Sequence, residues 1–373
     1  MPIEKYDGDH RMWFTGTTVT ERQKVFHFNG LDASERARWR EEKSAQPSLL
    51  TDPFTLAHAL IRTSMVGSRL TKMPPLSLAA MAVSALAILE KRAGHDALFI
   101  NAGFSSYKDF VGTGQKGLIG ASLAYLDLMD RGYTWVAHWE NLVSGRVKTA
   151  HPDFIFTDGR EVCIADAKGS GAPNIGETVK SAWKRQILPN CNSLAAIGLT
   201  TTKGYVIGTH IDPASPLAIY RAEGPFTTSS APSPSADDQN INLTIQQNCI
   251  ADVLHFLGWD DLSDAILNPL DMRSAAVAFE YDLALPVAPG QEIPPQLEFP
   301  ITVAGKTWMA KPFIQPKAYE VLFDRLISKR SNALPTAFED SIRRTEAEDG
   351  SEQVVVQFKD GTGTCFNSSC CQQ

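Results

Sequence analysis

The stretch HPDFIFTDGREVCIADAK, residues 151–168, decides the fold predicted for the middle of the chain. Residues 154–156 and 162–165 are apolar and rich in residue types that favour strands. Between them, Asp158-Gly159 is the strongest short signal for a tight hairpin turn. The stretch therefore predicts two antiparallel strands joined by a two-residue turn.

This hairpin would bring three charged side chains onto one face of a sheet. With a two-residue turn, Asp153 lies opposite Ile164, and Asp166 is its diagonal neighbour at about 7–8 Å between Cα atoms. Side chains alternate along a strand, so Lys168 shares that face. His151 would face Asp166 across the hairpin, either to orient that carboxylate or in a structural role only. Core packing does not require such a group at the ends of apolar strands.

Two carboxylates and an ammonium group suit the hydrolysis of a phosphodiester bond. Carboxylate oxygens bind hard divalent cations such as Mg²⁺, which keep several water ligands and also bind phosphate oxygens. The cation stabilises charge on the phosphoryl group and activates a bound water. A lysine can contact the scissile phosphate or assist deprotonation of that water. The alternative is a solvent-facing hairpin whose charged residues carry no chemistry.

Pro152-Asp153, a hairpin and then Asp166-Ala167-Lys168 resemble the motif of the PD-(D/E)xK nuclease superfamily, whose members include restriction endonuclease-like enzymes. The resemblance covers roughly residues 100–215. It implies an α/β fold with a mixed sheet flanked by helices, and Mg²⁺, replaceable by Mn²⁺, bound by both aspartates. It also implies a catalytic Lys168 and, on the following helix, a catalytic glutamine matched by Gln186.

Many members of that superfamily add a glutamate on the helix before the hairpin. The matching residues 120–123 contain none, and Asp127, Glu140 and Glu161 are weak substitutes, so the sequence leaves open whether one metal ion binds or two. Superfamily members serve restriction, antiviral defence, repair and interbacterial toxicity, and this chain would have a role of that kind.

Basic residues concentrate around the hairpin although the whole chain is acidic. Residues 141–210 contain eight basic and five acidic side chains, whereas the chain carries a net charge of −7. Lys180 and Lys184 are spaced to share one helix face, and Arg185 is adjacent, so all three are candidate contacts to substrate phosphates. A solvated helix face would show the same pattern.

The rest of the sequence predicts a chain with several parts. Residues 1–98 read as a mainly helical region, with helices over 36–43, 55–62 and 76–92. Glycines between residues 112 and 120 predict a loop before a helix over 122–130. A strand over 134–141, a helix over 175–188 and a strand over 204–211 complete a nuclease-like domain at 99–222. We expect a linker at 223–240 and a smaller C-terminal α+β domain at 241–373, with a helix over 245–257.

The overall composition is that of a soluble globular protein, with 43% hydrophobic and 21% charged residues. The most apolar stretch, residues 76–89, is shorter than the roughly 20 residues of a membrane-spanning helix. The N-terminus lacks the pattern of a secretory signal, and six scattered cysteines predict neither a disulfide framework nor a zinc site. We therefore expect a cytoplasmic protein with free thiols, although export without a signal stays open.

The function predicted from the sequence is that of a Mg²⁺-dependent endonuclease, with DNA favoured over RNA as the substrate. Asp153 and Asp166 would hold the metal, and Lys168 and Gln186 would assist catalysis. The first alternative is a non-catalytic nucleic-acid-binding or interaction protein that retained the fold. The second is an enzyme of another class whose activity lies in the C-terminal domain. The flanking regions could bind a protein partner or form a homodimer.

Overall fold

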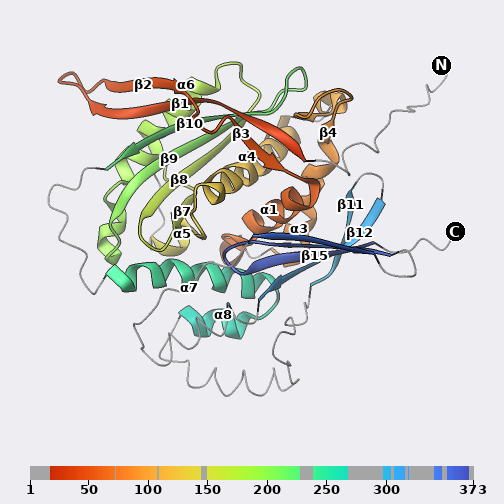
Figure 1. The fold of residues 1–373 in the computed structure, drawn as a ribbon. Helices are drawn as coiled ribbons and strands as arrows, with labels where there is room; N and C mark the ends of the chain where they lie inside the picture. Colours follow the sequence, from red (N-terminus) through yellow and green to blue (C-terminus); the bar gives the residue numbers. More distant parts are fainter. Residues whose placement is uncertain are drawn as a thin grey trace.

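The computed structural model describes residues 17–71, 73–106, 109–143, 149–226, 238–267, 297–303, 306–315, 318, 340–346 and 351–368. Within these residues the chain is a mixed α/β protein built around two larger β-sheets (Figure 1). One is a mixed sheet of eight strands, and the other is an antiparallel sheet of five strands from the C-terminal part. None of the described helices is long and apolar enough to cross a lipid bilayer.

The large sheet combines strands from the N-terminal and middle parts of the chain. Its order is β2 (Ala37–Lys43), β1 (Thr18–Leu31), β10 (Ala218–Pro225), β9 (Thr201–His210), β8 (Val162–Ser170), β7 (Phe154–Thr157) and β6 (Trp135–His138), and β3 (Ser48–Thr51) also pairs with β1. The pairs β1–β10 and β8–β9 are parallel, and the other pairs are antiparallel. The sheet is therefore mixed, as the sequence predicts.

Helices cover both faces of the large sheet because its central strands are apolar on both sides. On one face, α4 (Asp109–Asp130) packs against β8 and β9, and Cys163 and Ala165 of β8 point into that core. On the other face, α6 (Ile175–Ala182) covers Ile164 and its neighbours. The order α4, β6, β7, β8, α6, β9 follows the predicted succession of helix, three strands, helix and strand, except that the strand predicted over 134–141 ends at His138 and the short helix α5 (Trp139–Leu142) follows it.

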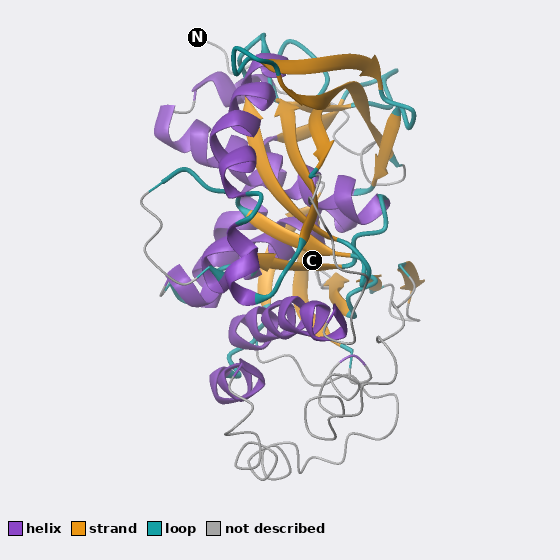
Figure 2. Ribbon diagram, turned by 90° about the vertical axis from the view of Figure 1, so that its left-hand side faces the viewer, coloured by secondary structure: helices purple, strands orange, loops and turns teal. Residues whose placement is uncertain are grey.

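The C-terminal sheet lies on the α4 side of the large sheet, beyond the helices that cover that face (Figure 1). Its order is β11 (Phe299–Val303), β12 (Lys306–Ile314), β15 (Thr362–Ser368), β14 (Glu352–Gln357) and β13 (Ser341–Glu346). The remaining elements are α1 (Pro53–Met65), α2 (Ser68–Thr71), α3 (Pro75–Ser84), β4 (Leu89–Lys91), β5 (Leu98–Ile100), α5 (Trp139–Leu142), α7 (Asp238–Phe256) and α8 (Asp260–Leu267). Figure 2 shows α7 lying across the end of the large sheet, where it packs along β6, with α8 beyond it.

Side chains from all parts of the chain share one hydrophobic core. Phe54 of α1 contacts Trp308 and Phe366 of the C-terminal sheet, at ring-centroid distances of 4.9 and 5.2 Å. Arg62 of α1 is fully buried, and its Nε lies 3.0 Å from Oδ2 of Asp360. These contacts cross the predicted domain boundaries at residues 98, 222 and 240. The boundaries themselves stay predictions. Residues 223–225 of the predicted linker belong to β10, and 227–237 lie outside the described residues.

The prediction of a mainly helical N-terminal region was wrong for residues 18–51, which form β1, β2 and β3. The helix expected over 36–43 is β2, paired antiparallel with β1. The carboxylate of Asp32 accepts the amides two and four residues further on, which stabilises a turn and not a helix start. The charged residues of β2 suit an exposed strand, and its partner β1 decides its conformation. The helix expected over 55–62 is confirmed by α1, whereas that expected over 76–92 ends at Ser84.

The glycine-rich loop predicted before residue 122 was also wrong, since α4 is helical from residue 109. Glycine lowers the stability of an isolated helix. In α4, however, a glycine lets the helix backbone approach β8 closely. A Cβ atom on Gly120 would lie 2.7 Å from the backbone nitrogen of Gly169. At that position the glycine permits close helix–strand packing. Cys163, Cys191 and Cys249 are free thiols, as expected.

Candidate metal centre

The turn between β7 and β8 is longer than predicted. Thr157 pairs with Val162, so four residues form the turn and the predicted two-residue turn was wrong. The carboxylate of Asp158 accepts the amides of Arg160 and Glu161 at 2.8 and 2.7 Å. These two bonds satisfy the backbone of the wider turn, which the Asp-Gly signal alone did not indicate.

The longer turn shifts the register by two residues, which keeps every side chain on its predicted face. As a result Asp153 lies directly opposite Asp166, and His151 does not face it. The Asp153 amide donates to the Ala165 carbonyl at 3.1 Å, and Asp153 Oδ2 accepts the Ala167 amide at 2.9 Å. Directly opposite residues have Cβ atoms only about 4.5–5.5 Å apart. The two carboxylates are therefore closer than the sequence predicted.

Asp166 is fully buried at the point where the core on the α6 side ends. Lys168 Nζ lies 2.8 Å from Asp166 Oδ1 and 2.7 Å from Oδ2. Only the contact with Oδ1 has the geometry of a hydrogen bond, so Oδ2 is buried without a hydrogen-bond partner. A buried carboxylate is costly unless a cation or a proton compensates for its charge, and the Lys168 ammonium supplies part of that compensation.

The electrostatic surroundings of Asp166 oppose its ionisation. Burial raises the pKa of the Asp166 carboxyl well above its ordinary value, and the neighbouring Asp153 carboxylate raises it further. The Lys168 ammonium lowers this pKa, but its effect is smaller than that of burial. Two carboxylates and one lysine thus leave a site that favours either a bound proton or an additional cation.

The oxygens of Asp153 and Asp166 fit a hard divalent cation such as Mg²⁺, which binds one or two carboxylates and retains water ligands. Oδ2 of Asp166 is buried, accepts no hydrogen bond and lies 2.7 Å from the Lys168 ammonium, and Asp153 is partly accessible. Within the described ranges, no three His, Cys, Asp or Glu side chains are grouped so that they could hold a metal ion together. The protein would therefore supply two ligands, and water and substrate the others.

The helix before the hairpin, α4, crosses β8 close to the candidate centre and supplies no glutamate to it. A Cβ atom on Gly169, the residue after Lys168, would lie only 1.8 Å from the carbonyl oxygen of Lys116 on α4. Helix and strand backbones are thus in contact beside the centre, on the opposite face from Asp166. At Gly120 and Gly169 the crossing leaves no room for a side chain.

Gln186 lies beside the hairpin on a π-helical turn, Trp183–Ile187, that follows α6. Its Nε2 donates to the carbonyl of His151 at 3.0 Å. The His151 ring stacks on Trp139 at an interplanar angle of 9°, and its Nε2 lies 3.1 Å from Glu140 Oε1. π-Helical turns are frequent at functional sites. The segment before Asp153 is therefore held in place from two sides, an arrangement for which the sequence offered no signal beyond Gln186.

The three predicted substrate contacts differ in their surroundings. Lys180 forms an ion pair with Glu177, and its Nζ lies 5.1 Å from the ring centroid of Phe26. Lys184 and Arg185 are exposed on the π-helical turn that carries Gln186. The latter two are thus accessible to a polyanion, whereas Lys180 is already engaged.

No family model, no curated protein and no solved structure matches this chain. The resemblance to the PD-(D/E)xK superfamily accordingly depends on the motif residues themselves. In the structure three of these residues, Asp153, Asp166 and Lys168, lie together at one end of the β7–β8 hairpin.

Proposed function

We propose that this protein is a metal-dependent nuclease that hydrolyses phosphodiester bonds of nucleic acid, DNA in preference to RNA. The observation that carries this proposal is the buried Asp166. It lies opposite a second carboxylate, has one oxygen without a hydrogen-bond partner, and contacts an ammonium group. Such a cluster is costly for folding, and its cost is consistent with a catalytic role.

Asp153 and Asp166 would hold the metal ion, which when bound stabilises charge on the phosphoryl group and lowers the pKa of a water molecule. The Lys168 side chain is 28% exposed, so its ammonium can reach a phosphate while it stays beside Asp166. It would contact the scissile phosphate or assist in removing a proton from the attacking water. Gln186 would orient the segment that carries Asp153.

Support for a restriction endonuclease-like fold comes from the order of elements around the centre. A helix, three antiparallel strands, a second helix and a parallel strand occur in the order that the resemblance predicts. Lys184 and Arg185, on the same side of the sheet as the carboxylates, would contact the phosphate backbone.

A non-catalytic nucleic-acid-binding or interaction protein is the second candidate. The observation that favours it is the small number of ligands, since only two carboxylates meet at the centre and the neighbouring helix supplies no third. A protein that had lost its metal would bind nucleic acid without cutting it.

Incubation of the purified protein with plasmid, single-stranded DNA and RNA, in Mg²⁺, Mn²⁺ or EDTA, tests the proposal. We expect cleavage in either metal and none in EDTA. Lys168→Ala should lower the rate ~10²- to 10³-fold, because the ammonium acts at the reacting phosphate. Lys203→Ala is the matched control, since that lysine is partly exposed on the adjacent β9 and pairs with Glu161. Binding without cleavage would favour the second candidate, and equal rates in both variants would refute the assignment.

A further inference from the structure

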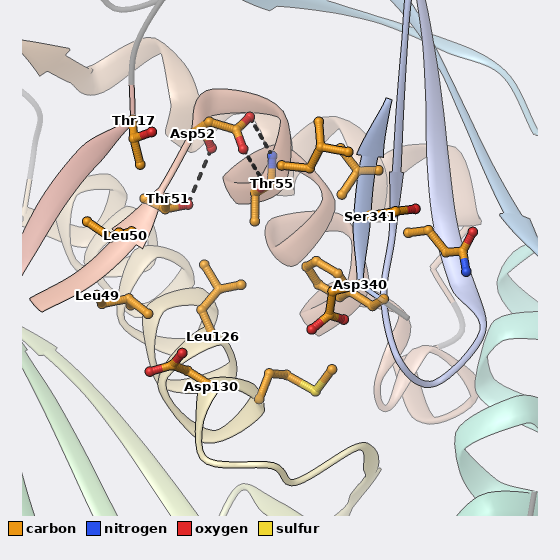
Figure 3. A pocket seen from close by; sticks show the side chains of 15 residues that line it. Thr17, Leu49, Leu50, Thr51, Asp52, Thr55, Leu126, Asp130, Asp340 and Ser341 are labelled. Carbon is orange, nitrogen blue, oxygen red and sulfur yellow. Dashed lines mark hydrogen bonds between the residues drawn. The ribbon is translucent and has the colours of Figure 1, made fainter. Parts of the chain in front are cut away.

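Among the residues that the structure describes, the pocket in Figure 3 presents no uncompensated charge to a ligand. It has a volume of about 460 Å³ and lies between β3, the C-terminal end of α4 and the strands β13 and β14. Asp130 in its lining pairs with Arg22 at 2.7 Å. Asp340 pairs with Lys359 at 3.4 Å, and Asp52 accepts the first-turn amides of α1. Cations without such a partner lie elsewhere, beside the candidate metal centre.

These cations are Lys184 and Arg185, on the π-helical turn after α6. Both side chains are exposed, and neither forms an ion pair with a residue in the described ranges. Trp183 precedes them, and Gln186, which follows, donates to the carbonyl of His151. The turn thus connects two basic side chains that are open to phosphate with the segment that leads into the catalytic hairpin.

Four aromatic rings lie together next to this turn. Trp183 is fully buried, and Phe28, Trp39 and Phe226 surround it with ring centroids at 5.4, 6.0 and 6.0 Å. The three outer rings are only partly buried against the core on the α6 side of the sheet. Trp39 is the one uncharged residue in the segment 38–43 of β2. We call Phe28, Trp39 and Phe226 the aromatic platform.

A pair of glycines in the sheet makes room for these rings. Gly204 of β9 and Gly224 of β10 lie directly opposite each other. A Cβ atom on Gly204 would lie 2.7 Å from the Phe226 ring and 3.0 Å from Trp183, and one on Gly224 would lie 3.3 Å from Trp183. Glycine in a strand permits such a close approach. The rings are therefore held against the sheet, and binding a ligand would cost them little freedom.

We infer that the aromatic platform binds unpaired nucleobases, so that the substrate class is single-stranded nucleic acid. Partly exposed rings beside basic side chains supply both parts of single-strand binding, which are stacking on the bases and contact with the phosphates. The bases of a duplex are already stacked on one another and cannot lie on a protein ring. The inference rests on the proposed function, which supplies nucleic acid as the substrate.

The position of the aromatic platform suits a strand that runs to the candidate metal centre. In the large sheet, β2 is the fourth strand from β8, counted through β9, β10 and β1. At the usual spacing of strands this separation is roughly 19 Å. The basic turn with Lys184 and Arg185 lies between, because its Trp183 packs on β9 and β10. A few nucleotides of extended strand would span from Trp39 to Asp166.

Fluorescence anisotropy with a labelled oligothymidylate of about 12 nucleotides tests the inference. The full chain is used in EDTA, so that binding is measured without cleavage. An abasic deoxyribose-phosphate strand of the same length has the same charge and no bases, and a duplex of the same length has paired bases. We expect oligothymidylate to bind at least ~5-fold more tightly than the abasic strand, and more tightly than the duplex, because only its bases can stack on the rings.

Trp39→Leu should weaken binding of oligothymidylate at least ~5-fold and leave binding of the abasic strand unchanged. Trp39→Phe keeps a ring and should retain most of the affinity. Trp259→Leu is the matched control, since that tryptophan is partly buried before α8, away from the aromatic platform, and its loss should change neither affinity. Lys184→Ala with Arg185→Ala should weaken binding of both strands alike, because these residues contact phosphate.

Equal affinity of the wild type for oligothymidylate and the abasic strand would overturn the inference, as would no binding of either. This comparison needs no variant, so it decides the matter even if Trp39→Leu does not fold. Unchanged oligothymidylate binding by folded Trp39→Leu would also overturn it. Cleavage in Mg²⁺ without base-dependent binding would refute the aromatic platform and leave the nuclease proposal intact. Base-dependent binding without cleavage would support the platform and refute the nuclease proposal.

Discussion

Replacing Asp166 by asparagine should abolish cleavage and at the same time stabilise the metal-free protein. The side chain is fully buried, and Oδ2 has no hydrogen-bond partner. An uncompensated buried charge costs several kcal/mol, and the Lys168 contact offsets part of this cost. Because an isosteric amide carries no charge, we expect a gain of roughly 1–3 kcal/mol in the free energy of unfolding at pH 8 in EDTA.

The dependence on pH follows from the direction of the pKa shift. The pKa of Asp166 is raised in the folded protein, mainly by burial. The group therefore binds a proton more tightly when folded, and its contribution to stability is fully present below the pKa of the unfolded chain. That contribution is lost as the pH rises through the folded-state pKa. The advantage of Asp166→Asn over the wild type should consequently be small near pH 4.5 and grow toward pH 8.

Urea unfolding at several pH values, with EDTA and with Mg²⁺, measures these effects. Mg²⁺ at ten times its dissociation constant should stabilise the wild type by about 1.4 kcal/mol and the variant much less. Asp153→Asn is the comparison, since Asp153 is partly accessible and already accepts the Ala167 amide; it should lose activity with little gain in stability. If Asp166→Asn unfolds more easily than the wild type in EDTA at every pH, then burial of the ionised Asp166 carboxylate does not destabilise the metal-free protein, and the reasoning is refuted.

Three further substitutions test other parts of the structure. Gln186→Ala should lower the cleavage rate about tenfold in single-turnover assays without changing the apparent affinity for Mg²⁺, because its side chain positions the backbone before Asp153. Gly169→Ala on β8 should lower the free energy of unfolding in urea by at least ~2 kcal/mol, since the added Cβ would overlap the α4 backbone. Gly114→Ala on α4 is the control: its Cβ meets no atom within 4 Å, so the change should be neutral or stabilising. Asp360→Ala should cost about 3–5 kcal/mol, measured by urea or thermal unfolding, because it leaves the Arg62 guanidinium buried without its counter-ion.

The sequence was sufficient to predict which side chains share a face of the hairpin. Strands alternate with a period of two, so the grouping of Asp153, Asp166 and Lys168 held although the turn was two residues longer than expected. The succession of helices and strands around the hairpin was also predictable, because each element carries its own periodic apolar pattern.

Features that depend on distant partners were not predictable in this way. The charged residues 36–43 fit a helix or an exposed strand equally, and only pairing with β1 decides between them. The glycines of α4 suggest a loop until the crossing with β8 is known. Asp153 lies directly opposite Asp166 because the turn has four residues, and this turn is stabilised by two backbone amides that donate to the Asp158 carboxylate. Rules for two-residue turns do not include these bonds.

The parallel pairing of β1 with β10 has a consequence for how the chain folds during its synthesis. The first strand lies at residues 18–31, and its central partner lies at 218–225. At a translation rate of about 5–20 residues per second, β1 would wait roughly 10–40 s before that partner emerges from the ribosome. During this interval its hydrogen-bonding edge and the apolar side chains of Val25 and Phe26 are without their final neighbours. Early association with β2 and β3, which follow it directly in the chain, would protect the nascent strand from aggregation until the sheet can close around it.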